Sequence, residues 1–260
     1  LSLGRCNGFW YARGMSKPTH TPLAISIIIP AYNEAAHIAH CLGALVPQLS
    51  PHDEIIVVDN NSTDATATIA AGYRQVRLVP EPRQGISYAR TAGFNAAHSP
   101  ILARIDADTI AHPSWLATIR QQFGAAADLG ALTGSIALAE FSPPGCFWAR
   151  WYFRRFRAWH QRRLGVAPML YGSNLALRRQ LWHAVAPQLS LGDRTISEDL
   201  DLTLAIHASG AVARHCPAML VKTHLLAAII NLPKQRHYYQ NDSRTLAKYG
   251  RVAQRRSPKL

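Results

Sequence analysis

The chain has 260 residues, of which 48% are hydrophobic and 17% charged, a composition that allows one full core and excludes a disordered chain. The four cysteines are scattered without C-x-x-C spacing, which indicates neither a zinc knuckle nor a disulfide framework and favours a reducing cytoplasm. The net charge of +13 is uneven: residues 147–260 hold nineteen Lys and Arg against five Asp and Glu, whereas residues 1–146 hold nine against ten. This asymmetry predicts an anionic partner for the second half: lipid head groups, nucleic acid or a phosphorylated substrate.

No stretch of the sequence approaches the roughly 18 apolar residues that a membrane-spanning helix needs. The first residues also lack the apolar core of a signal peptide. Met15 resembles a native start. We therefore expect residues 1–14 to come from a vector or from upstream translation, within an N-terminal extension over residues 1–23.

The first half alternates short apolar strands with helices of about ten residues. Strands are predicted at residues 24–30, 53–59, 76–79 and 101–105; between and after them we expect a helix capped by Asn33 that ends near Pro47, a short helix through Ala71, and helices over 86–97 and 113–123. This order predicts right-handed βαβ units and a mainly parallel sheet. In such sheets ligands bind outside the carboxyl ends of the strands.

Polar side chains follow three of the predicted strands. They are Tyr32, Asn33 and Glu34 after the first strand, Asp59 and Asn60 after the second, and Asp106 and Asp108 after the fourth. Carboxylates that converge in one crevice repel each other unless a cation is present, and hard divalent cations take oxygen ligands that they share with phosphates. A lone D-x-D is equally typical of a solvated turn. No G-x-G-x-x-G or P-loop follows any strand, which argues against a dehydrogenase and a P-loop NTPase.

Two arginines stand out near this crevice. Arg90 lies on the helix beside the acids, where its guanidinium could clamp a diphosphate; the alternative is an ordinary surface arginine. Arg104 is a charge inside an apparently buried strand. It either pairs with a neighbouring acid or lies at a sheet edge, and the sequence leaves both open.

Several motifs resemble those of the family-2 glycosyltransferases of GT-A fold. They are Ile-Ile-Ile-Pro-Ala-Tyr-Asn-Glu at 27–34, Glu-Ile-Ile-Val-Val-Asp-Asn-Asn-Ser-Thr-Asp at 54–64, the segment 85–93, Asp106-Ala-Asp108, Tyr-Gly-Ser-Asn at 171–174 and Ser-Glu-Asp-Leu-Asp at 197–201. The resemblance covers about residues 24–225. It implies a Rossmann-like nucleotide-diphospho-sugar transferase fold, α/β with a mainly parallel central sheet and C-terminal helices. We expect a catalytic domain over residues 24–228 and a basic helical tail over 229–260.

The resemblance also implies roles for individual residues. It assigns donor-nucleotide binding to Pro30, Tyr32, Glu34, Asp59, Arg90 and Asp106, a Mn²⁺ or Mg²⁺ site to Asp108 and His224, the catalytic base to Asp199, and donor sugar or acceptor contacts to Gly172, Ser173, Asn174 and Glu198. Asp199 stands at the start of an apparent helix, which would keep its carboxylate ionised, although an acid there can also serve as a cap. His224 as a ligand predicts a preference for Mn²⁺, and a histidine that binds no metal is the alternative.

An aromatic and basic stretch over residues 147–163 suggests how the acceptor side works. Trp148, Tyr152, Phe156 and Trp159 share one stripe at helical spacing, while Arg150, Arg154 and Arg157 share another. Such a helix can lie in a membrane interface with its arginines on anionic head groups. Alternatively, the aromatic stripe packs on the sheet as core.

The sequence thus predicts a metal-dependent, inverting glycosyltransferase that moves one sugar from a UDP- or GDP-linked donor to a sugar or lipid-linked acceptor. Residues 235–239 do not satisfy the Q-x-x-R-W motif of processive relatives, which favours transfer of a single sugar. We expect a cytoplasmic protein, peripheral on the inner face of the plasma membrane. Two alternatives remain: a basic nucleic-acid-binding protein, against which the lack of an RNA-binding motif argues, and a catalytically idle relative that only binds nucleotide sugars.

Overall fold

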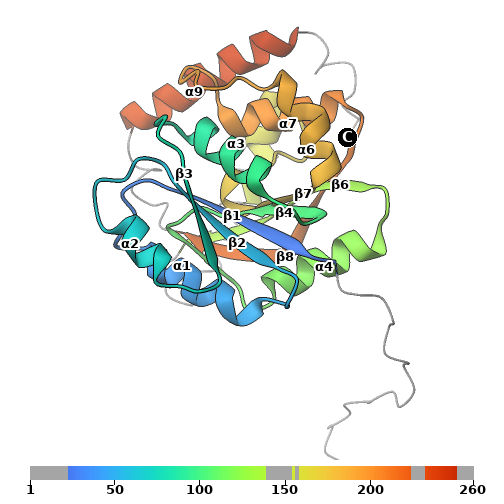
Figure 1. Cartoon of the computed structure of the whole chain (residues 1–260). Coiled ribbons are helices and arrows are strands. Elements are labelled where there is room, and N and C mark those ends of the chain that lie inside the picture. Colours follow the sequence, from blue (N-terminus) through green and yellow to red (C-terminus); the bar gives the residue numbers. More distant parts are fainter. Residues whose placement is uncertain (1–22, 139–153, 156–157, 224–231, 251–260) are drawn as a thin grey trace, which may run out of the picture.

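The computed structural model describes residues 23–138, 154–155, 158–223 and 232–250. Within these ranges the strands form one eight-stranded mixed sheet in the order β3-β2-β1-β4-β7-β6-β8-β5. Helices cover both faces of this sheet (Figure 1). The α/β class and the helical covering agree with the sequence-based prediction.

The first half of the sheet is parallel, as predicted. It consists of β1 (Ile25–Ala31), β2 (Glu54–Asp59), β3 (Val76–Pro80) and β4 (Ile101–Arg104). In the ladder, Ala31 pairs with Asp59 and Ile28 with Arg104, so these strands end at a common edge. All seven residues of β1 and all four of β4 are buried, because helices lie on both sides of them.

The second half of the sheet is mixed. β7 (Leu175–Arg178) runs antiparallel to both β4 and β6 (Leu129–Leu138), β8 (Val212–Thr223) is parallel to β6, and the three-residue β5 (Thr109–Ala111) pairs antiparallel with the end of β8. The chain pattern predicted none of β5, β6, β7 and β8. All four pair with segments that are far away in the sequence, and β5 and β7 are also very short.

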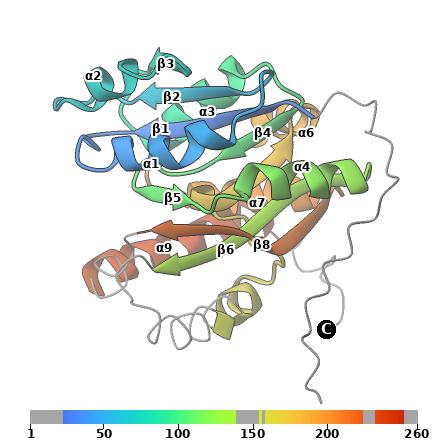
Figure 2. The ribbon, with the colours of Figure 1, turned by 90° about the horizontal axis from the view of Figure 1, so that it is seen from below.

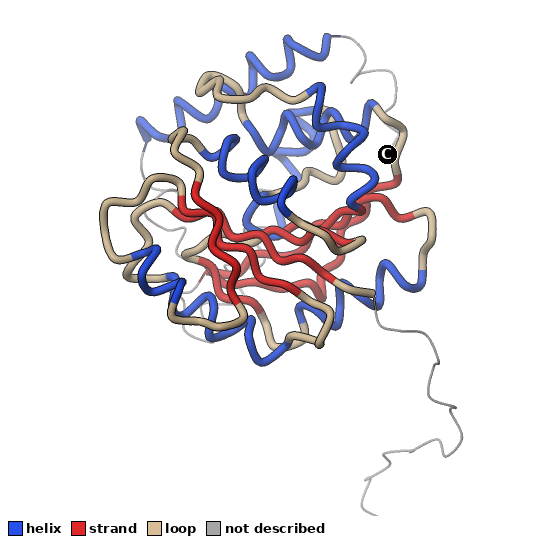
Figure 3. The backbone as a smooth tube through the Cα atoms, in the orientation of Figure 1, coloured by secondary structure: helices blue, strands red, loops and turns tan. Residues whose placement is uncertain are grey.

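The helices form layers above and below the sheet. α1 (Ile38–Leu45), α2 (Thr66–Ala71) and α4 (Trp115–Ala125) lie on one face; α3 (Ile86–Ala96), α6 (Arg179–Val185) and α7 (Glu198–Ala208) lie on the other, with α9 (Leu232–Tyr249) outside them (Figures 1 and 2). The tube view shows the strands as one layer between these helices (Figure 3). The other described elements are three short 3₁₀ turns, η1 (Val46–Gln48), η2 (Gly172–Asn174) and η3 (Ala186–Gln188), and helical residues at 154–155 and 158–164.

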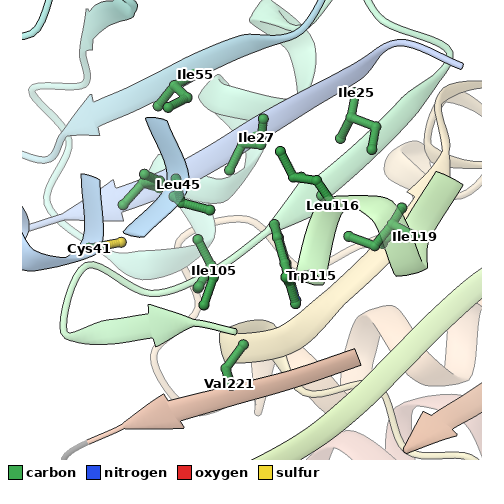
Figure 4. Close-up of a cluster of buried hydrophobic side chains, with 14 of the residues drawn as sticks. Ile25, Ile27, Cys41, Leu45, Ile55, Ile105, Trp115, Leu116, Ile119 and Val221 are labelled. Atoms are coloured by element: carbon green, nitrogen blue, oxygen red, sulfur yellow. The ribbon is translucent and has the colours of Figure 1, made fainter. Parts of the chain in front are cut away.

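Two apolar clusters hold the layers together. On one face, Ile27, Leu45 and Trp115 belong to a cluster that joins the parallel strands to α1 and α4 and reaches β8 at Val221 (Figure 4). On the other face, Phe94 of α3 packs edge-on against Trp182 of α6 with ring centroids 4.8 Å apart. The parallel strands that end at this edge are therefore packed against helices on both faces of the sheet.

α3 approaches the sheet very closely. A Cβ atom added at Gly93 would lie 2.5 Å from Cγ2 of Ile28 and 2.9 Å from Cγ2 of Val58. Only glycine fits between helix and strands at this point. The close approach brings the buried face of α3, including Arg90, next to the end of β4.

Candidate active site

A pocket of about 400 Å³ opens at the carboxyl ends of β1, β2 and β4. Among its lining residues are Pro30, Tyr32, Glu34, Asn60, Gly85, Arg104, Asp106 and Asp108. The predicted convergence of strand ends is therefore present. Five of the residues expected at the donor and metal site line this pocket, whereas Asp59 and Arg90 do not.

Hydrogen bonds from the loop after β2 hold the segment that carries Glu34. The backbone N–H of Glu34 donates to Oγ1 of Thr66 at 2.7 Å, and the N–H of Ala35 donates to Oδ2 of Asp64 at 3.1 Å. Asn33 adopts a left-handed conformation with φ 54°, and its Oδ1 accepts from the N–H of Thr63 at 2.8 Å. This turn chemistry shapes the pocket rim.

Asp59 and Asn60, at the end of β2, form hydrogen bonds with neighbouring parts of the chain. Oδ1 of Asp59 accepts from the N–H of Ser62 at 3.3 Å. Asn60 is buried; its Nδ2 donates to the carbonyls of Glu81 and Arg83 at 3.0 and 2.8 Å, and its Oδ1 accepts from the N–H of Gly85 at 2.7 Å. Asn60 therefore fixes the strand-to-helix loop that forms one pocket wall.

The pocket carries excess negative charge. Its charged lining residues are three acids, Glu34, Asp106 and Asp108, and one base, Arg104. Burial raises the pKa of Glu34, and the charges of Asp108 and Asp106 raise it further against the effect of His37. The pKa of Asp106 is raised mainly by burial, which outweighs Arg104, with Asp108 adding to the shift. Crowded carboxylates of this kind fit a hard divalent cation, which would relieve their repulsion.

Arg104 lies in the middle of the sheet and pairs with acids, which answers the question that the sequence left open. Its side chain is 3% exposed, and its Nη1 donates to Oε1 of Glu198 at 2.5 Å. Its Nη2 donates to Oδ1 of Asp106 at 3.2 Å. Arg104 therefore joins the pocket floor to the first turn of α7.

Arg90 and Glu198 form a buried ion pair with each other. Arg90 is fully buried and pairs with Oε2 of Glu198, and its Nη1 also donates to the carbonyl of Glu198 at 3.1 Å. Glu198 is thus held between two arginines, which outweigh its burial and lower its pKa. Diphosphate binding by Arg90 and a sugar or acceptor contact by Glu198 stay predictions.

Asn174, in η2, makes its hydrogen bonds within the protein. It is fully buried: its Oδ1 accepts from Nε1 of Trp115, and its Nδ2 donates to the carbonyls of Ser135 and Met219, each at 2.9 Å. These three bonds tie α4, β6 and β8 together, and the expected contact of Asn174 with donor sugar or acceptor stays a prediction. Ser173 is half-buried and stays a candidate for contact.

Gly172 is needed for packing. A Cβ atom at this position would lie 2.5 Å from Cζ of Arg104, so the glycine makes room for the buried guanidinium. Its N–H donates to Oδ2 of Asp199 at 2.9 Å. The sequence could not predict this contact, because Arg104 and Gly172 are far apart in the chain and neither residue type by itself indicates its partner.

Asp199 lies beside this network in the first turn of α7. Its side chain is 30% exposed, and its Oδ1 is 3.5 Å from Nη1 of Arg104. Burial and the neighbouring Glu198 raise its pKa well above the usual value, although Arg104 and the Gly172 N–H oppose the shift. A raised pKa makes the ionised carboxylate a stronger base, and partial exposure leaves Asp199 open to a substrate hydroxyl.

Some expected site residues fall outside the described part of the chain. These are His224 and, from the aromatic and basic stretch, Trp148, Arg150, Tyr152, Phe156 and Arg157. Among the residues that the structure does describe, no three His, Cys, Asp or Glu side chains are grouped so that they could hold a metal ion by themselves. Within the same ranges, no helix is long and apolar enough to span a bilayer.

The mixed sheet and the acidic pocket at its parallel edge place the chain in the GT-A class of α/β folds. Two solved structures support this: mannosyltransferase PcManGT from Pyrobaculum calidifontis (TM-score 0.61, 19% identity, 94% of this chain and 78% of that one) and glucosyl-3-phosphoglycerate synthase from Mycobacterium tuberculosis (TM-score 0.63, 20% identity, 91% and 80%). The GT-A fold is therefore confirmed.

Sequence comparison gives the family. The sequence model of the family described as "Glycosyl transferase family 2" matches residues 26–185, which is more than half of the chain. The chain therefore belongs to this family. It is 40% identical over 105 residues to glycosyltransferase AglE of Haloferax volcanii (38% of this chain, 34% of AglE) and 27% identical over 216 residues to the probable glycosyltransferase YdaM of Bacillus subtilis (75% and 49%). The chain thus spans about a third to a half of the length of these relatives.

Proposed function

We propose that this chain transfers a single sugar from a nucleotide diphosphate donor to an acceptor hydroxyl, with inversion at the anomeric carbon. The observation that carries the proposal is an acid-lined pocket at the parallel strand ends with a partly exposed carboxylate, Asp199, held beside its floor through Arg104. Membership of the family supports the same activity.

The donor would lie in the pocket. Tyr32, 45% exposed, offers a flat surface for the nucleoside, and Glu34 and Asp59 remain the proposed contacts for ribose and base. The solved relatives support this class of donor: PcManGT was solved with GDP-Man and Mn²⁺, and the mycobacterial synthase with UDP and Mg²⁺.

Asp106 and Asp108 are the proposed holders of Mn²⁺ or Mg²⁺, with His224 as a further candidate. Two carboxylates leave coordination positions for phosphate oxygens, which suits a cation that is shared with the donor. When bound, the cation would neutralise charge on the departing nucleoside diphosphate. Arg104 lies against Asp106 and contributes a fixed positive charge on the same side of the pocket.

Asp199 is the proposed base. The acceptor oxygen attacks the anomeric carbon as the bond from that carbon to the diphosphate oxygen breaks, and the acceptor proton passes to the Asp199 carboxylate. The products are the glycosylated acceptor, with its new bond on the opposite face of the sugar, and the nucleoside diphosphate. The N–H of Gly172 orients the carboxylate through Oδ2.

A donor panel tests the proposal. UDP-glucose and GDP-mannose are incubated with Mn²⁺ or Mg²⁺, and nucleoside diphosphate release is measured beside thermal shifts with UDP and GDP. We expect either UDP or GDP to raise Tm in the presence of the cation. We expect the nucleotide sugar with the same base to release its nucleoside diphosphate. Nucleotide binding without release from any donor would favour the idle relative, and RNA retention in a filter assay without any nucleotide shift would favour the nucleic-acid-binding alternative.

We also propose that the acceptor side rests on an anionic membrane surface. Trp159 and Tyr238 are 47% and 46% exposed, and Arg154 and Arg155 are exposed near Trp159 in the chain. Aromatic rings with flanking arginines suit the head-group region of a bilayer. Co-sedimentation with anionic but not zwitterionic vesicles, lost in a Trp159→Ala and Tyr238→Ala double variant but kept in Leu191→Ala, would support it. Equal binding by all three proteins would contradict it.

A further inference from the structure

We infer that α9 positions the first turn of α7, and with it Asp199, through Thr245, Lys248 and Tyr249. The inference rests on the proposed function only for the role of Asp199. The contacts between the two helices stand by themselves. α9 lies outside the family match, which ends at residue 185, and it was expected from the sequence to be only a basic tail.

Thr245 binds the backbone of Ser197, the N-cap residue directly before α7. Its side chain is fully buried, and its Oγ1 accepts from the backbone N–H of Ser197 at 2.8 Å while its hydroxyl donates to the carbonyl of Asn241 at 2.7 Å. The first N–H groups of a helix have no partner within the helix. Thr245 therefore supplies from α9 a partner that the start of α7 requires.

Asp201 is the second point of attachment. Its side chain is 1% exposed, and its Oδ1 accepts from Nζ of Lys248 at 2.7 Å and from Oη of Tyr249 at 2.8 Å. Its other oxygen accepts from the N–H of Ser190 at 2.7 Å. A carboxylate buried this completely is tolerated only because it is paired and hydrogen-bonded on all sides.

The same face of α9 also holds the chain just before α7. Nδ2 of Asn241 donates to the carbonyl of Arg194 at 3.1 Å, and Leu246 packs against the apolar cluster that contains Leu200 and Leu204. Asn241 and Thr245 are four residues apart, and Lys248 and Tyr249 follow three and four residues later, so all four share one face of the helix. One face of α9 therefore contacts α7 and its entrance.

The three acids in the first turn of α7 have separate tasks. Glu198 pairs with Arg90 and Arg104, Asp201 pairs with α9, and Asp199 between them accepts from Gly172. Asp199 itself has no contact with α9 among the described interactions. Glu198, the residue before Asp199, is held by two arginines, and Asp201, two residues after it, is held by α9. Thr245, Lys248 and Tyr249 therefore act as positioning residues for Asp199.

The experiment compares Thr245→Val with a matched control on the same helix. Ser243 is exposed, and its hydroxyl makes the same type of bond to a carbonyl four residues earlier, that of Tyr239 at 2.9 Å. Ser243→Ala therefore removes a hydroxyl of this type without touching α7. Thr245→Ser keeps the hydroxyl and serves as the rescue. Hydrogen exchange of the amides of residues 197–201 and the split between kcat and KM are measured for each.

We expect Thr245→Val to speed exchange in the first turn of α7 by about tenfold, in line with one lost hydrogen bond. We expect kcat to fall by about tenfold with the donor KM changed less than about twofold, because donor contacts lie on the other side of the pocket. Thr245→Ser and Ser243→Ala should behave like the unaltered chain. If Thr245→Val does not fold, Tyr249→Phe is measured in the same way, because it keeps the ring and removes the hydroxyl that donates to Oδ1 and to the carbonyl of Asp201.

Exchange and kcat equal to those of the unaltered chain in both Thr245→Val and Tyr249→Phe would overturn the inference. A chain without turnover on any donor would refute the proposed function. The exchange measurement would then still decide whether α9 holds α7. The two failures are therefore distinguishable.

Discussion

The candidate site has two walls that are held together by different forces: the donor wall, made by the loops after β1 and β2, and the α7 wall, made by Arg90, Arg104 and Glu198 beside the pocket. On the donor side, the loops after β1 and β2 are joined by neutral and backbone hydrogen bonds between segments about thirty residues apart, such as Glu34 with Thr66. On the α7 side, buried ion pairs join residues 94 and 108 positions apart, Arg104 and Arg90 with Glu198. The donor wall can form as a local βαβ unit, whereas the other wall requires the whole sheet to assemble first.

Removing the shared acid should break the long-range wall most strongly. Glu198→Ala leaves Arg90 buried without its carboxylate, and we expect the free energy of unfolding to fall by about 3–5 kcal/mol. The control is Arg214→Met, which breaks an exposed pair with Asp128 whose side chains are 48% and 61% exposed, at a cost of about 0.5 kcal/mol. Urea unfolding measures both. Similar losses in the two variants would show that the buried network contributes nothing special.

Changing the proposed base should separate chemistry from folding. Asp199→Asn keeps the size of the side chain and removes the proton acceptor, and we expect kcat to fall about 10³-fold, or about 4 kcal/mol of transition-state stabilisation. Nucleotide binding, measured by thermal shift with UDP or GDP, should stay within about twofold. Retention of full transfer activity in this variant would remove Asp199 from the proposed mechanism.

A change on the donor wall should have the opposite signature. Asp108→Ala removes one proposed ligand and one of three clustered acids, so we expect donor affinity in the presence of Mn²⁺ to fall about 100-fold. Stability without the cation should not fall, because the remaining acids repel each other less. Titration calorimetry with and without Mn²⁺ gives the comparison. Unchanged cation-dependent binding would contradict the metal assignment.

Filling the space at Gly172 tests the junction of the two walls at a smaller scale. Gly172→Ala places a methyl group 2.5 Å from Cζ of Arg104, and overpacking of this kind should cost about 1–3 kcal/mol. Gly124→Ala in α4 is the matched control, because nothing lies within 4 Å of its Cβ position. In a helix this control should gain about 0.5–1 kcal/mol. Thermal unfolding of both proteins gives the signs; a gain in both would mean that Arg104 moves away freely.

The parts of the fold that could be predicted share a simple origin. The β-branched runs that form β1, β2 and β4 are buried on both faces, so each reads as an apolar segment that ends in a polar turn. The positions of Glu34, Asp106 and Asp108 at one pocket follow directly from parallel order. β5, β6, β7 and β8 were not predicted in this way. They pair with one another and with β4 across long stretches of chain, and such pairing leaves no local pattern in the sequence.

The contacts of the polar residues within the protein could be predicted less well than their positions. Asn174 and Arg90 stand in motifs, but one ties three elements together in the core and the other neutralises Glu198. A motif shows that a residue type is required without showing whether a substrate or the protein itself requires it. Burial decides between the two, and burial is a property of the packed chain.

The sequence by itself determined the alternation of strands and helices in the first half, the edge at which the acids meet and a helix that starts near Asp199, because these depend on local patterns and on the direction of the chain. Only the tertiary structure decided which acid faces the pocket, which arginine is fully buried and what α9 contacts. Those outcomes depend on pairs of charges and hydrogen bonds that are far apart in the chain and become neighbours only when the sheet is complete.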